Sequence, residues 1–232
     1  MKLNDLFDAI YYINLDSRTD RDDEFWGLNN NFLCRERTIR ISAFDARNPN
    51  VADGALPLMR ARAAHSVSYS KPFRHAIENN FKKILVLEDD AEPMIKDPAE
   101  VYSLIKDCQQ TEYDILFLGG TVQSQLTKEN EFLYKVKNNV LTTHAISFCD
   151  NNNLFQTIAL LGNNYEATFN YLTRQRNCFA TDLLTSELTL KYRSFFPKSL
   201  IYGQYESFSD IDGQNASYNN DMINRFAKFT AS

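Results

Sequence analysis

The segment that most constrains the fold is 82–91, where an unbroken aliphatic run ends on three consecutive carboxylates. Residues 84–87 are Ile-Leu-Val-Leu, which is typical of a strand buried on both faces of a sheet. The carboxyl end of that strand would deliver Glu88, Asp89 and Asp90 to the sheet edge, where open α/β folds place their ligands. Adjacent carboxylates repel one another, so we expect a divalent cation to neutralise them. A solvated acidic turn is the alternative.

Strands and helices are expected to alternate along the first 120 residues, which indicates βαβ units and a largely parallel sheet. The expected strands there are 8–15, 38–44, 84–87 and 113–118. The expected helices are 19–33, 57–80 with an interruption at Pro72, and one that begins at Asp97-Pro98. Beyond residue 120 we expect strands at 132–136, 145–149 and 199–202, and helices at 151–162 and 181–192. The chain is therefore predicted to be a single α/β domain over residues 1–232.

Composition limits the classes of protein to which the chain can belong. Its 232 residues include four widely spaced cysteines with no CxxC pair, which argues against a zinc site or a disulfide framework. No apolar stretch approaches the roughly 18 residues of a membrane span, and the first residues do not resemble a signal peptide. We therefore expect a cytoplasmic protein without a transmembrane segment.

Charge is unevenly distributed along the chain. The net charge is −5, which disfavours an unselective nucleic-acid binder. Segment 32–75 nevertheless carries eight basic residues against three acidic ones. A solvated helix face would account for part of this excess, and a phosphate-rich ligand or acceptor would account for it as well.

Five local patterns occur in a fixed order along the chain. They are Tyr12-Ile13-Asn14-Leu15-Asp16-x-Arg18-x-x-Arg21, Ala43-Phe44-Asp45-Ala46-Arg47, Leu85-Val86-Leu87-Glu88-Asp89-Asp90-Ala91, Asp114-Ile115-Leu116-Phe117-Leu118-Gly119 and Ser207-Phe208-Ser209-Asp210-Ile211. In this order the patterns resemble glycosyltransferase family 25, which includes lipopolysaccharide β-galactosyltransferases and collagen galactosyltransferase domains. The resemblance covers roughly residues 8–212.

This resemblance implies a fold of the GT-A type, with a mixed, mostly parallel sheet flanked by helices. It also implies a nucleotide-sugar donor, Mn²⁺ or Mg²⁺, and inversion at the anomeric carbon. The simplest donor is a UDP-hexose, and the default acceptor is a hydroxyl of a surface-glycan or lipopolysaccharide precursor, met peripherally at the membrane if it is lipid-linked. Residues 1–120 would then form the donor-binding half and residues 121–232 the acceptor-side half.

The family's DxD-like position falls on Glu88-x-Asp90. A cation beside the donor diphosphate would stabilise the charge that develops on the leaving group. We assign the metal contact chiefly to Asp90, with Glu88 assisting. Asp89 is assigned to orientation of the donor sugar.

Other donor contacts are expected from the first two strands. Asn14 and Leu15 end the first strand, and Asn14 suits recognition of the nucleotide base or ribose. Arg18 and Arg21 can pair with diphosphate oxygens through the guanidinium fork, or instead form salt bridges at the start of the helix. Asp45 matches an acidic nucleotide-binding position of the family.

Two departures from the family pattern bear on specificity. Ala46 replaces a glycine that follows the aspartate, so the backbone there loses conformational freedom. Tyr69 stands where the family has a histidine, and His65 lies one helical turn earlier on a similar face. Either side chain is a candidate to replace the missing polar contact, and an ordinary structural histidine is the alternative for His65.

An inverting transfer requires a base that accepts the proton of the acceptor hydroxyl. The candidates are Asp182 and Asp210, with His144 as a third. A helix N-cap is the structural alternative for Asp182, and Asp210 would alternatively complete the metal site or cap a final helix.

Two further functions remain open at this point. The basic segment 32–75 would suit transfer to a hydroxymethylated base of viral DNA. The departures at Ala46 and Tyr69 would suit a non-catalytic module that binds a sugar nucleotide or glycan.

Overall fold

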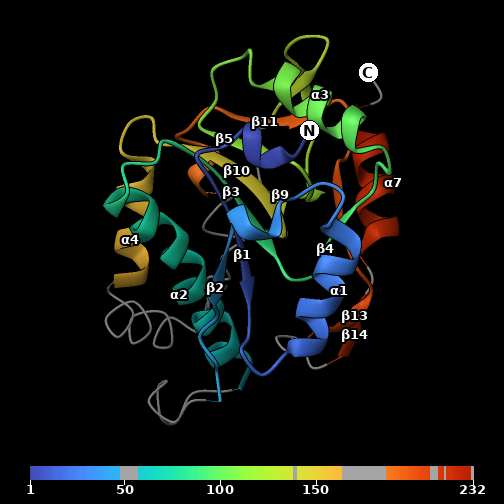
Figure 1. Ribbon diagram of the computed structural model, residues 1–232. Coiled ribbons are helices and arrows are strands. Elements are labelled where there is room, and N and C mark those ends of the chain that lie inside the picture. The colour runs from blue at the N-terminus through green and yellow to red at the C-terminus, as the bar shows by residue number, and fades with distance from the viewer. Residues whose placement is uncertain (48–56, 138–139, 164–186, 210–213, 217, 231–232) are drawn as a thin grey trace.

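The computed structural model describes residues 1–47, 57–137, 140–163, 187–209, 214–216 and 218–230 (Figure 1). Its first half contains η1 (Leu3–Asp5), β1 (Ala9–Asn14), α1 (Thr19–Asn29), η2 (Arg35–Arg37), β2 (Thr38–Ser42), α2 (Pro57–Glu78), β3 (Lys83–Glu88), β4 (Ala91–Pro93), α3 (Pro98–Cys108) and β5 (Ile115–Phe117). Its second half contains β6 (Thr121–Val122), β7 (Thr127–Lys128), β8 (Leu133–Lys135), β9 (Val140–Leu141), β10 (Ala145–Cys149), α4 (Leu154–Asn163), β11 (Ser194–Pro197), β12 (Tyr202–Gln204), β13 (Ser207–Ser209), β14 (Gln214–Ala216) and α7 (Asn219–Thr230).

Eight of these strands form a central sheet in the order β2-β1-β3-β10-β5-β11-β8-β7. Parallel pairing joins β1 to β2, β1 to β3 and β5 to β11, whereas β10 runs antiparallel to both β3 and β5. Strands from both halves of the chain therefore contribute to one sheet. The predicted class, α/β with a mixed and mostly parallel sheet flanked by helices, is confirmed.

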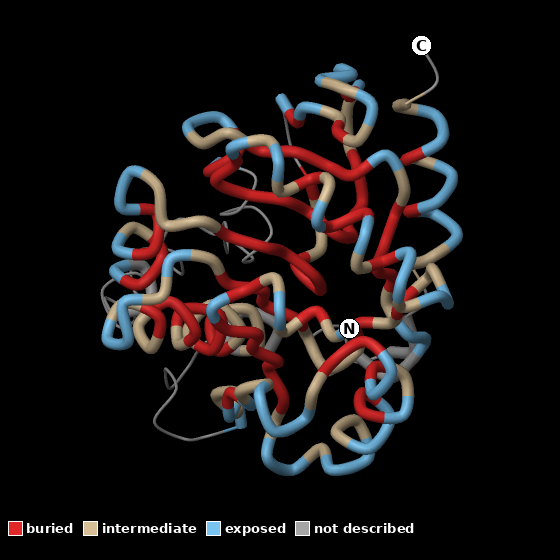
Figure 2. Tube along the Cα trace, turned by 45° about the horizontal axis from the view of Figure 1, so that its top comes forward, coloured by how far each residue is buried: buried red, intermediate tan, exposed pale blue. Residues whose placement is uncertain are grey.

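The alternation of side chains along each strand separates the core into two layers. From β1, Tyr11 and Ile13 enter the cluster under α2 and α4, and Ile10 and Tyr12 enter the cluster under α1 and α3. In Figure 1, α2 and α4 lie side by side over one face of the sheet. Figure 2 shows the buried residues concentrated along the central strands, with exposed residues on the outer helices.

The prediction that Pro72 interrupts its helix is wrong. Helix α2 runs without a break from Pro57 to Glu78, with Pro72 inside it. Proline lacks the N–H that would bond the carbonyl one turn earlier, so continuity must come from packing. Tyr69 and Phe73 flank the proline and are both buried in the core, with at most 1% of their surface exposed.

Two other expectations are corrected at the ends of elements. Helix α1 stops at Asn29 rather than near residue 33, because the Asn29 side chain donates hydrogen bonds to the carbonyls of Phe25 and Ala91 at 3.0 and 2.9 Å. Of the strand expected at 199–202, only Tyr202 lies in a strand, because β11 ends at Pro197 and β12 begins at Tyr202. The helix expected at 181–192 lies largely outside the described residues. In the described part of the chain, no helix is long and apolar enough to cross a membrane.

Candidate functional site

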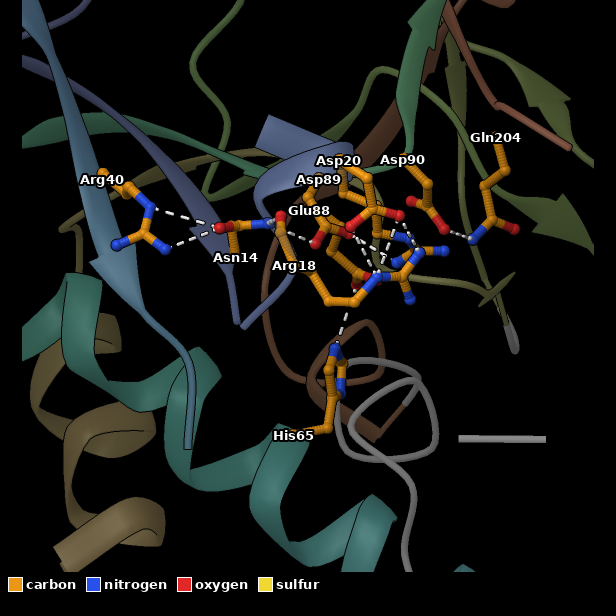
Figure 3. A network of polar contacts seen from close by, with 10 residues as sticks. Asn14, Arg18, Asp20, Arg40, His65, Glu88, Asp89, Asp90 and Gln204 are labelled. Carbon is orange, nitrogen blue, oxygen red and sulfur yellow. Dashed lines mark hydrogen bonds and ion pairs between the residues drawn. The ribbon is translucent and has the colours of Figure 1, made fainter. Parts of the chain in front are cut away.

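The three carboxylates lie at the carboxyl end of β3, as the sequence predicts. Parallel pairing places Ile13 of β1 opposite Glu88, so the ends of the two strands lie side by side. On the other edge of β3, antiparallel β10 begins beside the same point, and Glu88 N donates to the carbonyl of His144 at 2.9 Å. The acidic motif is therefore enclosed by the ends of three strands, and each of its carboxylates contacts different partners (Figure 3).

Asp89 is held by Asn14 and Arg21. Nη1 of Arg21 donates to Oδ1 of Asp89 at 2.7 Å, and Nδ2 of Asn14 donates to Oδ2 at 2.9 Å. The Arg21 and Asp89 side chains are only 11% and 10% exposed. In this structure Asp89 is thus neutralised by a protein cation.

The Asn14 side chain is itself fully engaged. Its Oδ1 accepts hydrogen bonds from Nε and Nη2 of Arg40 at 3.2 and 2.6 Å, while its Nδ2 also donates to the carbonyl of Arg18 at 3.1 Å. Asn14 is 1% exposed. Its visible role is therefore to orient Asp89 and Arg40, and its contact with a nucleotide stays a prediction.

Glu88 faces α2 and the start of β10. Nε2 of His65 lies 3.2 Å from Oε1 of Glu88, and the Thr143 hydroxyl donates to the same oxygen. Burial alone would raise the pKa of Glu88, but His65, Thr143 and His144 together lower it to about 2. This carboxylate is therefore ionised at neutral pH.

Asp90 is the least satisfied of the three carboxylates. Its Oδ2 accepts one hydrogen bond, from Nε2 of Gln204 at 3.3 Å, and within the described residues its buried Oδ1 has no partner. Burial, together with the negative charges of Glu88 and Asp89, raises the pKa of Asp90 to about 8. A cation beside Asp90 would compensate the negative charge of this carboxylate.

The remaining predicted donor residues lie on the loops that follow β1 and β2. Arg18 pairs with Asp20 at 2.8 Å, and its N–H donates to the Leu15 carbonyl at 2.9 Å. Asp45 pairs with Arg47 at 2.6 Å, and Arg47 also donates to Ser17 at 2.9 Å. The second contact ties the loop after β2 to the loop after β1.

The structure places Tyr69, His65 and His144 in three different environments. Tyr69 is buried in the core, whereas His65, one turn earlier on α2, faces the acidic motif. His144 is fully buried beside the Tyr202 carbonyl, and burial lowers its pKa to about 4. Asp182 and Asp210 lie outside the described residues, so their assignment as bases stays a prediction.

Three residues of this network had no recognisable pattern in the sequence: Arg40, Thr143 and Gln204. Thr143 and Gln204 contact the motif, and Arg40 contacts Asn14. Their positions depend on strand pairings that are distant in sequence, of β10 and β2 in the central sheet and of β12 with β4. Among the described residues, no group of three or more histidine, cysteine, aspartate or glutamate side chains is arranged to hold a metal ion. Any cation here would depend on fewer protein ligands, or on amide oxygens.

Comparisons with known proteins give no family. No family model matches the chain, and no curated protein matches it. The crystal structure of A197 from STIV resembles it with a TM-score of 0.39 and 12% identity, covering 90% of this chain and 93% of that chain. Mannose-1-phosphate geranyltransferase from Thermus thermophilus gives a TM-score of 0.45 and 10% identity, covering 82% of this chain and 72% of that chain. Similarities of this degree carry no functional argument, so function is argued from the site.

Proposed function

We propose that this chain is a nucleotide-sugar-dependent glycosyltransferase of the GT-A type, with its donor site at the carboxyl ends of β1 and β3. One observation carries the proposal. In a partly buried motif of three carboxylates, Glu88 and Asp89 are held by protein partners, while Asp90 retains a buried oxygen without a partner in the described residues. This is the arrangement expected of a carboxylate that binds a cation together with an anionic ligand.

The oxygen ligands available at this site fit a small divalent cation. Mg²⁺ and Mn²⁺ favour oxygen ligands, and Mg²⁺ at phosphate sites commonly binds one or two carboxylates with substrate phosphates and water. Asp90 would hold the ion. When bound, the ion would stabilise the charge that develops on the diphosphate leaving group.

The neighbouring side chains would keep the site in place. His65 and Thr143 fix Glu88, so an ionised carboxylate stands next to Asp90 at neutral pH. Arg21 and Asn14 fix Asp89 beside the β1 terminus. We propose that the sugar is a hexose carried on UDP and that the acceptor is a hydroxyl of a glycan precursor.

The arginines of segment 32–75 do not favour the DNA acceptor. Four of them form ion pairs with carboxylates: Arg35 with Asp22, Arg37 with Asp5, Arg40 with Asp16 and Arg47 with Asp45. Much of the local positive charge is thus compensated within the protein. A steep dependence of duplex binding on salt concentration would be required to revive that function.

The test is calorimetric titration of UDP-, GDP- and CMP-sugars in the presence and absence of Mn²⁺, followed by donor hydrolysis. We expect one donor to bind with Mn²⁺ and to be cleaved. Asp90→Asn should abolish cleavage, and Asp107→Asn, at the end of α3, should leave it unchanged. If the donor binds in the presence of Mn²⁺ but is not cleaved with any acceptor tested, the non-catalytic module is favoured. Absence of donor binding in the folded wild type would refute the proposal.

A further inference from the structure

Gln204 is held beside Asp90 by backbone contacts on both sides. It ends β12, which pairs with β4 so that Gln204 stands opposite Ala91, the residue after Asp90. The following N–H, of Tyr205, donates to the Asp90 carbonyl at 2.7 Å, and Gln204 N donates to Oδ1 of Asn219 at 2.8 Å. The position of this side chain is therefore set by β4 and by the start of α7.

Gly203 makes the contact with α7 possible. A Cβ at this position would lie 2.3 Å from Oδ1 of Asn219, the atom that accepts the Gln204 N–H. A side chain here would displace the Asn219 amide, which accepts the Gln204 N–H. The close contact between these two distant segments therefore places Gln204 next to the acidic motif.

The side chains of Asp90 and Gln204 each contain an oxygen that needs a partner. Nε2 of Gln204 lies 3.3 Å from Oδ2 of Asp90. In the part of the chain that the structure describes, neither Oδ1 of Asp90 nor Oε1 of Gln204 has a hydrogen-bond partner, although both atoms are buried. A buried polar atom is rarely left without a partner, so two such atoms on contacting side chains indicate a ligand that supplies positive charge.

The spacing of the pair suits a cation between them. A half-turn of the terminal amide exchanges Nε2 and Oε1, which places an amide oxygen beside Oδ2 at the same separation. Adjacent ligands in an octahedral shell of about 2.1 Å radius lie roughly 3 Å apart. The 3.3 Å between the amide tip and Oδ2 is close to that value.

We propose that Gln204 is a ligand of the divalent cation, through Oε1, and shares the ion with Asp90. This inference rests on the proposed function, because it concerns the same site, and it assigns a cation contact that the acidic motif alone does not supply. The donor diphosphate and water would supply the other ligands. The proposal also explains how an ion can be held where only one carboxylate of the motif has an unpartnered buried oxygen among the described residues.

The test is a direct titration of Mn²⁺ with and without UDP. Binding is measured by calorimetry and by the loss of the electron paramagnetic resonance signal of free Mn²⁺. Four variants are compared with wild type: Gln204→Met, Gln204→Glu, Asp90→Asn and Gln109→Met. Gln109 is the matched control, because it is a half-buried glutamine that donates to the Leu6 carbonyl away from the motif. Thermal unfolding and circular dichroism verify that each variant is folded.

We expect Gln204→Met to weaken Mn²⁺ binding by more than the roughly 10–100-fold that loss of an outer-shell partner typically costs. Gln204→Glu, which retains an oxygen ligand, should bind Mn²⁺ at least as tightly as wild type, and Gln109→Met should be unchanged. Equal affinity in Gln204→Met and wild type would overturn this inference alone, as would similar losses in both Gln204 variants. A wild type that binds neither Mn²⁺ nor UDP would overturn the proposed function along with it.

Discussion

Arg21 and Asp89 form a nearly buried ion pair, with Nη1 of the arginine 2.7 Å from Oδ1 of the aspartate. The pair joins the first turn of α1 to the end of β3. Two charges removed from water in this way are stable only together, because each one alone would be buried without compensation. The N-terminal helix and the acidic motif are therefore coupled energetically as well as spatially.

Removal of one partner should be strongly destabilising. We expect Arg21→Met to lower the free energy of unfolding by about 3–5 kcal/mol, because it leaves the Asp89 carboxylate without its cation. The double variant Arg21→Met with Asp89→Leu should recover a large part of that loss. Urea unfolding at pH 7 measures both. Additive losses in the double variant would show that the two residues are not coupled.

Gly119 should tolerate no side chain. A Cβ there would lie 2.3 Å from both Nε2 of His144 and the Tyr202 carbonyl oxygen, and the second contact is with backbone. Gly119→Ala should therefore cost about 1–3 kcal/mol or more in unfolding free energy. The matched control is Gly27→Ala in α1, where nothing lies within 4 Å and helix propensity predicts a gain of about 1 kcal/mol. A thermal melt that shifts downward equally in both variants would contradict this prediction.

The buried imidazole of His144 should make stability depend on pH. Burial lowers its pKa from 6.5 to about 4. Protonation of His144 therefore favours the unfolded chain. The stability that depends on its neutral imidazole is fully present above about pH 6.5 and is lost as pH falls towards 4. The loss amounts to roughly 3 kcal/mol, at about 1.4 kcal/mol per pKa unit.

The variant His144→Gln tests the assignment, since it keeps a donor for the Tyr202 carbonyl and cannot titrate. Urea unfolding between pH 7 and 4 should show a flatter stability profile in the variant than in wild type. The contribution of Glu88, whose pKa is lowered to about 2, is lost only at more acidic pH. Parallel profiles for the two proteins would assign the pH dependence to other groups.

His65 and Glu88 should be coupled across the gap between α2 and β3. Their atoms are 3.2 Å apart and their side chains are 18% and 17% exposed. Contacting residues of one polar network typically show coupling energies of about 0.5–3 kcal/mol, so we expect a value in that range. A double-mutant cycle with His65→Leu and Glu88→Gln provides the measurement. A coupling energy near zero would show that His65 lies there without holding the carboxylate.

The sequence predicts the first half of the fold well, because its signals are local. The aliphatic run before Glu88 can form only a buried strand, and Asp97 caps α3 as its position before Pro98 indicates. The pairing of β10 between β3 and β5 could not be predicted, since it depends on contacts between residues that are far apart in sequence. The bounds of helix α7 could not be predicted either, because its mostly polar residues bury only Met222 and Phe226.

The residues of the candidate site likewise fall into a group that local sequence signals predict and a group that depends on long-range strand pairing. Asp89 with Asn14 and Arg21 was predictable as a cluster, because parallel strands end at a common edge. Gln204 was not, because no property of a glutamine in segment 202–205 distinguishes it until β12 pairs with β4. The burial of Tyr69 in the core could not be predicted either, because it follows from the continuation of α2 through Pro72.

The central position of β10 has a consequence for the growing polypeptide. Until residue 149 leaves the ribosome, β3 has one edge without a partner, and an unpaired apolar strand is a template for association with other chains. Glu88 likewise lacks Thr143 and His144 during that interval, and Asp90 lacks Gln204 for longer still. The acidic centre is encoded by residues 88–90 but is completed only after Gln204 has been synthesised.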